Sequence, residues 1–232
     1  MPRVRDDSIY EEMQVKIKSF ARQQMAEGGT ASISLRGIAT ALQVTAPALY
    51  RYYPTRDDLL TALIVDAFNA LADALEAAEA AHAAAKAPAQ LMAVLHAYRQ
   101  WALEHPTDFQ LIYGNPIPGY DAPSDVTVPA VVRTFIPLVR PLSLASENGL
   151  FTPQPPFTDI PPHIAAHEQA LVERGSYPID VKTFHIAMIL WAQLHGVIML
   201  ELFHHIAPNV GDVDAFYDSS LRAMLTVMGM KW

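Results

Sequence analysis

The 232-residue chain has no cysteine, and charged residues make up only 17% of it. The lack of cysteine excludes a disulfide framework, thiol catalysis and thiolate metal sites, and it fits a reducing cytoplasm. Hydrophobic residues make up 51% of the chain, which is ample for a buried core. We therefore expect a folded, cytoplasmic protein without cysteine chemistry.

An export signal is also lacking. Residues Met1–Asp7 are charged and no apolar stretch follows them, so the sequence predicts neither a signal peptide nor an N-terminal anchor. One later segment, Phe184–Phe203, is about long enough to span a bilayer. Its polar residues favour a buried helix instead, because ionisable groups are rare inside membranes: His185, Gln193, His195 and Glu201. We expect no membrane partner.

Motifs of common enzymes are missing as well. The chain has neither a Gly-x-Ser-x-Gly nucleophile elbow nor a glycine-rich phosphate loop. Its nine histidines include His163 and His167, whose i, i+4 spacing can hold zinc on one helix face. A zincin-type protease needs glutamate directly after the first histidine, where this chain has Ile164. We expect surface histidines, no metal, no cofactor and no enzyme; a metal-dependent enzyme is the alternative.

The net charge of −8 is unevenly distributed. Residues 1–60 carry eight Lys or Arg against seven Asp or Glu, a balance of +1, whereas residues 61–232 carry eight against seventeen, a balance of −9. Basic side chains that share one face can still bind phosphates, while an acidic region is repelled by them. The distribution therefore allows the first sixty residues, and not the rest, to contact nucleic acid.

Alanine and leucine dominate the sequence, and the apolar residues recur at helical spacing. We predict an all-α fold with about nine to ten helices and no strand, divided into residues 1–60 and residues 61–232. The expected helices cover residues 8–28, 34–42, 46–53, 55–87, 89–104, 106–113, 163–174, 181–206 and 213–228, with a broken helix over 128–148 in a proline-rich stretch.

Residues 34–53 hold two short helices separated by a tight turn. Ser34 and Thr45 are good N-cap residues, Pro47 is tolerated in a first helical turn, and Pro54 ends the second helix. Such a pair describes a helix-turn-helix, whose second helix can lie in the major groove of DNA. Its outward side chains are short or aromatic and can contact thymine methyl groups or phosphates: Thr45, Ala46, Ala48, Tyr50 and Tyr52.

This region carries a set of linked motifs: Ser34-Leu35-Arg36-Gly37-Ile38-Ala39, then Val44-Thr45-Ala46-Pro47-Ala48-Leu49-Tyr50-Arg51-Tyr52-Tyr53-Pro54, then Arg56 and Leu59-Leu60. The set resembles the tetracycline-repressor (TetR) family, and the resemblance covers about residues 8–65. It implies a DNA-binding regulator. Three positions depart from the family pattern: Gln43 stands where glycine is usual, Tyr52 where histidine is usual, and Tyr53 where phenylalanine is usual.

The resemblance also implies roles for individual residues in DNA binding. The expected phosphate contacts are Thr45, Tyr50, Tyr52 and Arg56. Arg36 is expected to lie near the DNA, and the residues expected to face base edges are Ala46, Pro47 and Ala48.

The sequence Trp191-Ala192-Gln193-Leu194-His195-Gly196 resembles the Trp-His-Gly (WHG) subclass of C-terminal domains in the same family. Two interpretations of this element stay open: a core tryptophan beside a hydrogen-bonded buried histidine, or a histidine that contacts a ligand. The family likeness implies a pocket for a small molecule in this larger helical domain, and side chains that could line it are Trp101, Phe109, Tyr113, Phe135, Met188, Trp191 and His195.

The segment Val181–Ile206 is apolar on every face and must be covered on every face. Paired with the last helix across a two-fold axis, it would form a four-helix bundle. The candidate interface residues are Leu194, Val197, Ile198, Leu221, Met224, Leu225 and Met228.

The predicted function combines these features. We expect a homodimeric, ligand-responsive repressor that binds a pseudo-palindromic double-stranded DNA operator and is released by a small hydrophobic effector. Besides the metal-dependent enzyme, the alternative is a helical ligand-binding protein that does not bind DNA.

Overall fold

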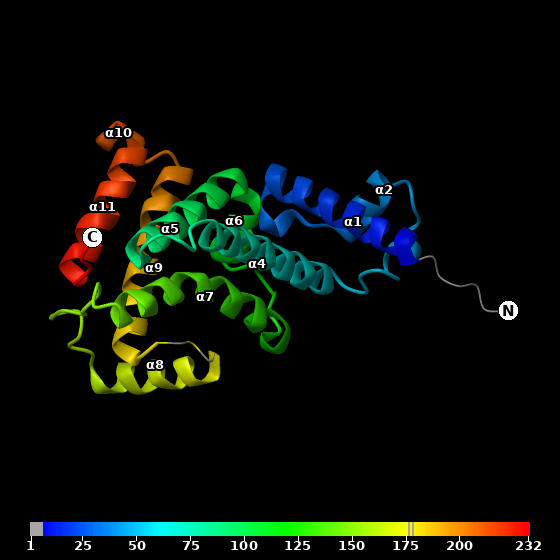
Figure 1. The fold of residues 1–232 in the computed structure, drawn as a ribbon. Helices are drawn as coiled ribbons and strands as arrows, with labels where there is room; N and C mark the ends of the chain where they lie inside the picture. The colour runs from blue at the N-terminus through cyan, green and yellow to red at the C-terminus, as the bar shows by residue number, and fades with distance from the viewer. Residues whose placement is uncertain (1–6, 176, 178) are drawn as a thin grey trace. The chain divides into compact units, whose positions relative to one another are not determined.

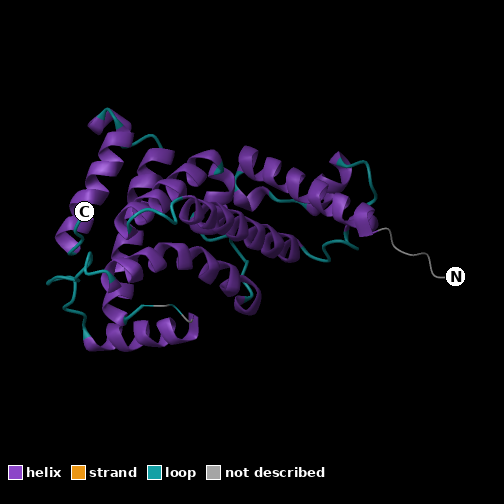
Figure 2. Cartoon of the chain, in the orientation of Figure 1, coloured by secondary structure: helices purple, strands orange, loops and turns teal. Residues whose placement is uncertain are grey.

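All regular secondary structure in the described part of the computed structural model is helical (Figure 2), which confirms the all-α prediction. The described residues are 7–175, 177 and 179–232. The sequence predicted neither a signal peptide nor an anchor at Met1–Asp7, and most of that segment, residues 1–6, lies outside the described range. Within it, one isolated β-bridge joins Phe151 and Met230.

Eleven α-helices and one 3-10 helix follow one another along the described chain (Figure 1). The extra helix relative to the predicted ten is α10, because α9 ends at Leu202, and His204 then adopts a left-handed φ of 59°. The elements are α1 (Asp7–Gly28), η1 (Thr30–Ser32), α2 (Leu35–Ala41), α3 (Ala46–Leu49), α4 (Arg56–Ala81), α5 (Ala87–Glu104), α6 (Pro106–Tyr113), α7 (Ser124–Glu147), α8 (Pro162–Gly175), α9 (Val181–Leu202), α10 (Ala207–Val210) and α11 (Val213–Met228).

The chain forms two compact units. The first comprises Met1–Phe68 and His105–Pro129, and the second comprises Asn69–Glu104 and Ala130–Trp232. The division expected from the sequence is contiguous, whereas these units are not, because α6 and the loop after it group with the N-terminal helices. α4 contributes its first half to one unit and its second half to the other.

The core of the first unit follows from apolar residues repeated at helical spacing. α1 buries Ile17, Ala21 and Met25, each one turn after the last. Further buried side chains come from α2, α3, the first half of α4, and α6: Leu35, Ile38, Ala39, Leu49, Leu59, Leu60, Leu63, Ala67, Phe109 and Leu111. The helices surrounding the helix-turn-helix are therefore held by a common core.

The core of the second unit is centred on α5, which is buried along most of its length. α9 begins at Asp180, whose carboxylate accepts hydrogen bonds from the N–H groups of Lys182 and Thr183 at 2.8 and 3.0 Å. α11 begins at Asp212, which caps it in the same way through Ala215. These caps fix where the two helices expected at a dimer interface start.

The predicted broken helix over residues 128–148 is wrong, because α7 runs unbroken from Ser124 to Glu147. It contains Pro129, Pro137 and Pro141, each of which removes one backbone hydrogen bond. Pro137 and Pro141 are buried in the second unit together with Ala130, Leu138, Val139 and Leu142. Tertiary packing of this face therefore outweighs the local preference of proline.

Within the part of the chain that the structure describes, two helices, α7 and α9, are long and apolar enough to cross a membrane, judged by length and composition alone. The sequence drew attention to α9 only. This is weak evidence for a membrane span, because the core helix of a globular protein passes the same test. Both helices contribute side chains to the core, for example Val139 of α7 and Leu194 of α9, each fully buried.

Tyr53 gives a stability prediction. Its side chain is buried, no hydrogen-bond partner of its hydroxyl is found in the described structure, and burial, followed by the nearby Asp66 charge, raises its pKa to about 12. A buried hydroxyl without a partner is destabilising. We expect Tyr53→Phe to raise the free energy of unfolding by about 1 kcal/mol in urea denaturation.

Tyr217 is the matched control for this experiment. Its hydroxyl is equally buried but donates a hydrogen bond to the Leu95 carbonyl at 2.7 Å. Tyr217→Phe should therefore lower the free energy of unfolding by about 1 kcal/mol. A loss of stability in both variants would show that the Tyr53 hydroxyl is bonded in solution.

Candidate functional site

The helix-turn-helix is assembled from α2, a four-residue turn and α3. Ser34 caps α2 by accepting a hydrogen bond from the Gly37 N–H at 3.2 Å. Gln43 occupies the turn with φ of 55°, the left-handed conformation that explains why glycine is usual there. Val44 closes the corner by donating its N–H to the Ala39 carbonyl at 3.0 Å. Leu49 anchors α3 in the core.

None of the residues predicted to meet DNA is buried. Those that are exposed are Arg36, Thr45, Pro47 and Tyr50, and those that are half-buried are Ala46, Ala48, Tyr52 and Arg56. Thr45 is the N-cap residue of α3 as expected, but its side chain makes no capping hydrogen bond. Its hydroxyl is therefore available to a partner outside the chain. α3 itself is shorter than the expected 46–53.

Tyr52 and Arg56 have contacts within the chain that the sequence did not predict. The Tyr52 ring stacks on Tyr10 of α1, with ring centroids 4.6 Å apart. Arg56 donates to the carbonyl of Ile33 at 3.3 Å, and its Nη2 lies 3.5 and 3.4 Å from the carbonyls of Thr30 and Ala31. Both side chains thus position elements around the helix-turn-helix.

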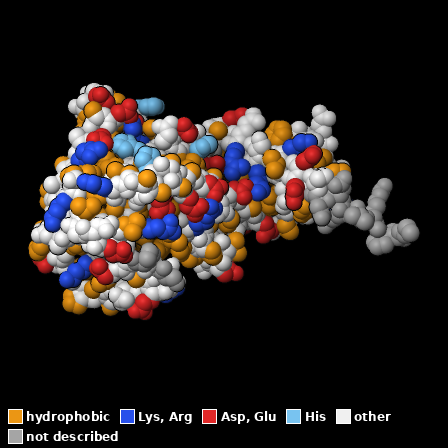
Figure 3. Space-filling view, viewed as in Figure 1, with side chains coloured by type: hydrophobic (Ala, Val, Ile, Leu, Met, Phe, Trp, Pro, Cys, Tyr) orange, Lys and Arg blue, Asp and Glu red, His pale blue; other side chains and the backbone are white. Residues whose placement is uncertain are grey.

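Basic and acidic side chains are interspersed on the face shown in Figure 3. In the first unit, Lys18 pairs with Asp66 at 2.7 Å, and Arg22 pairs with Asp108 at 2.9 Å. These cations are neutralised locally. Attraction of this unit to phosphates therefore depends on single basic side chains other than Lys18 and Arg22, and not on a continuous basic surface.

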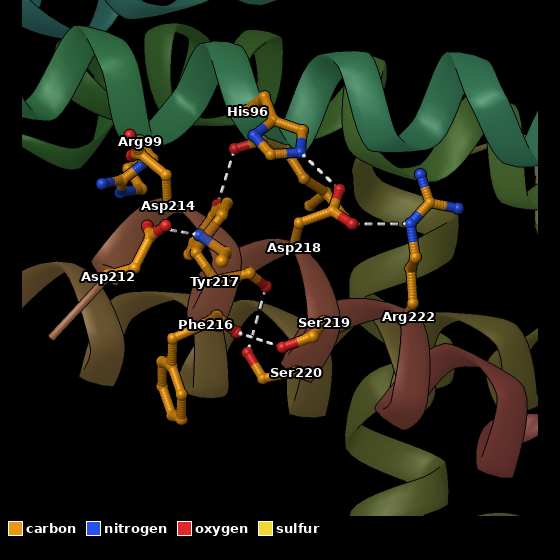
Figure 4. A network of polar contacts seen from close by, with 12 residues as sticks. His96, Arg99, Asp212, Asp214, Phe216, Tyr217, Asp218, Ser219, Ser220 and Arg222 are labelled. Atoms are coloured by element: carbon orange, nitrogen blue, oxygen red, sulfur yellow. Dashed lines mark hydrogen bonds and ion pairs between the residues drawn. The ribbon is translucent and has the colours of Figure 1, made fainter. Parts of the chain in front are cut away.

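In the second unit, the buried Arg99 of α5 lies close to Asp214 of α11 (Figure 4) and forms a polar cluster with its acidic neighbours. It donates to both carboxylate oxygens of Glu201 on α9 at 2.6 Å and lies 2.7 Å from Asp214 of α11. Its guanidinium carbon is 5.1 Å from the centre of the Tyr217 ring. The hydrogen bond to Glu201 raises the pKa of Arg99 above its ordinary value. Arg99 thereby links α9 and α11 through α5.

His96 of α5 lies beside this cluster, with its side chain 42% exposed. Its Nε2 is 3.1 Å from Asp218, which also accepts a hydrogen bond from Arg222 at 2.7 Å (Figure 4). The Arg222 bond, followed by the His96 bond, lowers the pKa of Asp218. His96 is therefore in polar contact with α11 through Asp218.

The Trp-His-Gly element is tied to α5 by hydrogen bonds. The Tyr98 hydroxyl lies 3.3 Å from Trp191 Nε1, which donates to it, and 3.3 Å from His195 Nδ1. Burial lowers the pKa of His195 to about 4, so the ring is neutral at pH 7. Its Nδ1 can then accept a hydrogen bond from the Tyr98 hydroxyl. This geometry agrees with the first interpretation, a core tryptophan beside a hydrogen-bonded histidine.

The predicted ligand residues fall into several groups. Phe109 and Tyr113 belong to the first unit, where Tyr113 meets Phe68 edge-on with ring centroids 5.6 Å apart. In the second unit, Phe135 packs against Tyr177 and Phe184. Trp191 and His195 form the Tyr98 network, and Trp101 is buried in the core.

Met188 lines a groove of about 410 Å³ between α8 and α9. His163, His167 and Glu168 line the same groove, and the carboxylate of Glu168 also accepts a hydrogen bond from His185 Nδ1 at 2.9 Å. Among the described residues, no group of three or more His, Asp or Glu side chains could hold a metal ion.

The dimer residues expected from the sequence are mostly part of the chain's own core. Those buried within a single copy are Leu194, Ile198, Leu221, Leu225 and Met228, while Val197 and Met224 are half-buried. The same helices and the turn after α9 expose other apolar side chains, with Leu200 46%, Phe203 48% and Val227 64% exposed. The helical repeat identified apolar faces but could not tell which face the chain itself covers.

Known proteins share both parts of this arrangement. Residues 17–63 match the family described as bacterial regulatory proteins, tetR family, and residues 91–224 match the tetracyclin repressor-like, C-terminal domain. The HTH-type transcriptional regulator Rv1816 of Mycobacterium tuberculosis is 32% identical over 221 residues, which cover 94% of this chain and 93% of that protein.

Solved structures also resemble this chain. The crystal structure of SCO4313, described as a regulatory protein, has 31% identity and a TM-score of 0.76, covering 97% of this chain and 100% of that one. RolR in complex with resorcinol has 19% identity and a TM-score of 0.55, covering 97% and 91%, and so shows a shared fold. This chain therefore belongs to the TetR family of DNA-binding transcriptional regulators, with the helix-turn-helix in its N-terminal region.

Proposed function

We propose that this regulator is a repressor that binds a pseudo-palindromic operator as a homodimer and is released by a small hydrophobic effector. The observation that carries the DNA-binding part is the exposed surface of α3 and its two cap residues. Thr45, Pro47 and Tyr50 are exposed there, while Leu49 anchors the helix in the core. A short helix anchored on one face and open on the other suits insertion into a major groove.

The side chains of α3 favour a particular kind of sequence recognition. Ala46, Pro47 and Ala48 offer no bidentate hydrogen bonds to base edges, unlike Arg or Asn. Discrimination should then depend on apolar contacts with thymine methyl groups, on phosphate contacts that fix the position of the helix, and on DNA shape. Two copies with a fixed spacing of about 34–36 Å between recognition helices would supply much of the specificity.

A second copy of the chain fits the exposed face of α9 and α11. Ala192, Gly196 and Leu200 lie one helical turn apart and are exposed. A Cβ atom added to Gly196 would meet nothing within 4 Å, so the surface is open for close approach by another helix. Val227 offers an exposed apolar side chain on α11. Pairing these helices across a two-fold axis would form a four-helix bundle.

An effector would act by favouring one arrangement of the helical core. Trp101, Phe135, Met188, Trp191 and His195, which all belong to the second unit, remain the proposed contacts. Because α4 has one half in each unit, it is the proposed connection between effector and DNA. RolR, which has this fold, was solved with resorcinol, and this supports a small aromatic molecule as the first class to test.

We place the protein in the cytoplasm and assign it no catalytic activity.

The test uses duplexes selected from a random DNA pool and fluorescence anisotropy with the wild-type protein and Tyr50→Phe. Wild-type affinity should be tight and should fall steeply with salt. Tyr50 is 40% exposed, so its hydroxyl can donate to a phosphate. Its loss should weaken binding about tenfold on all sequences alike, at unchanged melting temperature.

A flat response of the wild-type protein at low salt would instead support the helical ligand-binding alternative. A changed base preference of Tyr50→Phe would show that Tyr50 reads bases.

The dimer is tested by sedimentation at micromolar concentration. The double variant Leu200→Glu with Val227→Glu places charges on the proposed interface and should be monomeric, because burying unpaired charges is strongly unfavourable. Val15→Glu is the control, since Val15 is 66% exposed on α1 in the other unit, and it should leave the dimer intact. A monomeric wild type, or a double variant that still dimerises, would contradict the proposal.

A further inference from the structure

The arginines nearest the recognition helix differ in their contacts within the chain. Arg56, which family likeness assigned to a phosphate, donates to the Ile33 carbonyl at 3.3 Å, with its Nη2 near the carbonyl of Ala31 at 3.4 Å. These acceptors belong to η1 and the residue after it. The side chain of Arg56 is half-buried, so moving it to a phosphate would break its contacts with this turn.

Arg51 lies closer to the base-facing residues and is exposed. In the described part of the chain, no carboxylate or carbonyl holds its guanidinium. The helical turn continues beyond α3, because the N–H of Tyr53 donates to the Leu49 carbonyl at 3.2 Å. Arg51 follows Pro47 by four residues and Ala48 by three, so it lies on their face of the helix. A cation on this face lies where a groove-bound helix meets the flanking phosphates.

Arg36 is the other exposed arginine of the helix-turn-helix. It lies in the first turn of α2, directly after the Ser34 cap and Leu35. The remaining cations of α1 that face inward, Lys18 and Arg22, are held by Asp66 and Asp108. Arg36 and Arg51 are therefore the two helix-turn-helix arginines whose charge is available to DNA.

We propose that Arg51, together with Arg36, binds the DNA phosphates that flank the recognition helix, and that Arg56 is a positioning residue for the turn before α2. The proposal rests on the DNA binding proposed above and adds a residue that the family likeness did not assign. Two copies of each arginine in a dimer would neutralise about four phosphates. The logarithm of affinity should then fall with the logarithm of salt concentration with a slope of about −3.6 from these contacts.

The experiment measures anisotropy of a mixed-sequence 30-base-pair duplex, and of a duplex selected from a random pool, over a range of salt concentrations. Arg51→Gln should weaken binding to both about tenfold at low salt and reduce the slope by about 1.8 for two copies. Arg51→Lys keeps the charge and should retain the slope. Arg56→Gln should lower the melting temperature and leave the slope unchanged.

Lys182→Gln is the charge-matched control, because Lys182 is an exposed cation of the second unit, and it should behave as the wild type does. An unchanged slope for Arg51→Gln, or a slope lost in Arg56→Gln instead, would overturn the proposal. So would a change of base preference in Arg51→Gln on single-base variants of the selected duplex, because it would show that Arg51 reads a base. If the wild-type protein shows no salt-dependent binding, the proposed function itself fails.

Discussion

The core of each unit depends on the apolar stripe of α4. Leu59, Leu60, Leu63 and Ala67 are fully buried in the first unit, and Leu71, Ala72 and Leu75 are fully buried in the second. The alanines in this stripe allow close packing of neighbouring helices. One continuous helix therefore supplies core residues both to the unit that holds the helix-turn-helix and to the unit that holds the Trp-His-Gly element. Any large substitution in the stripe should affect the packing on which that unit's function rests.

Polar contacts then fix individual helices against these cores. In the second unit, Arg133 of α7 pairs with Asp73 and Glu76 of α4, and the resulting hydrogen bonds raise its pKa. Arg99 of α5, which is buried in the core, pairs in the same way with Glu201 of α9 and Asp214 of α11. The acidic surplus of residues 61–232 is thus partly used to hold arginines of the same region. The cations proposed to meet DNA, Arg36 and Arg51, are exposed side chains of the helix-turn-helix.

The sequence predicted the helix-turn-helix well because its signals are local. Ser34 caps its helix, and Gln43 adopts the left-handed turn that its position required. Tertiary choices were not predictable in this way. Prolines suggested a break in α7 that packing of Pro137 and Pro141 overrides. Helical periodicity marked Leu194 and Leu225 as apolar but not as covered by their own chain, and motif likeness could not show that Arg56 contacts carbonyls while Arg51 stays exposed.

The central claim is that two copies of the chain place two α3 helices on one DNA duplex. Hydroxyl-radical footprinting on a selected duplex, combined with native mass spectrometry of the same complex, tests it most directly. We predict two chains per duplex and two protected segments whose centres lie about 34–36 Å apart, one turn of the double helix. One chain per duplex with a single protected segment would contradict the account.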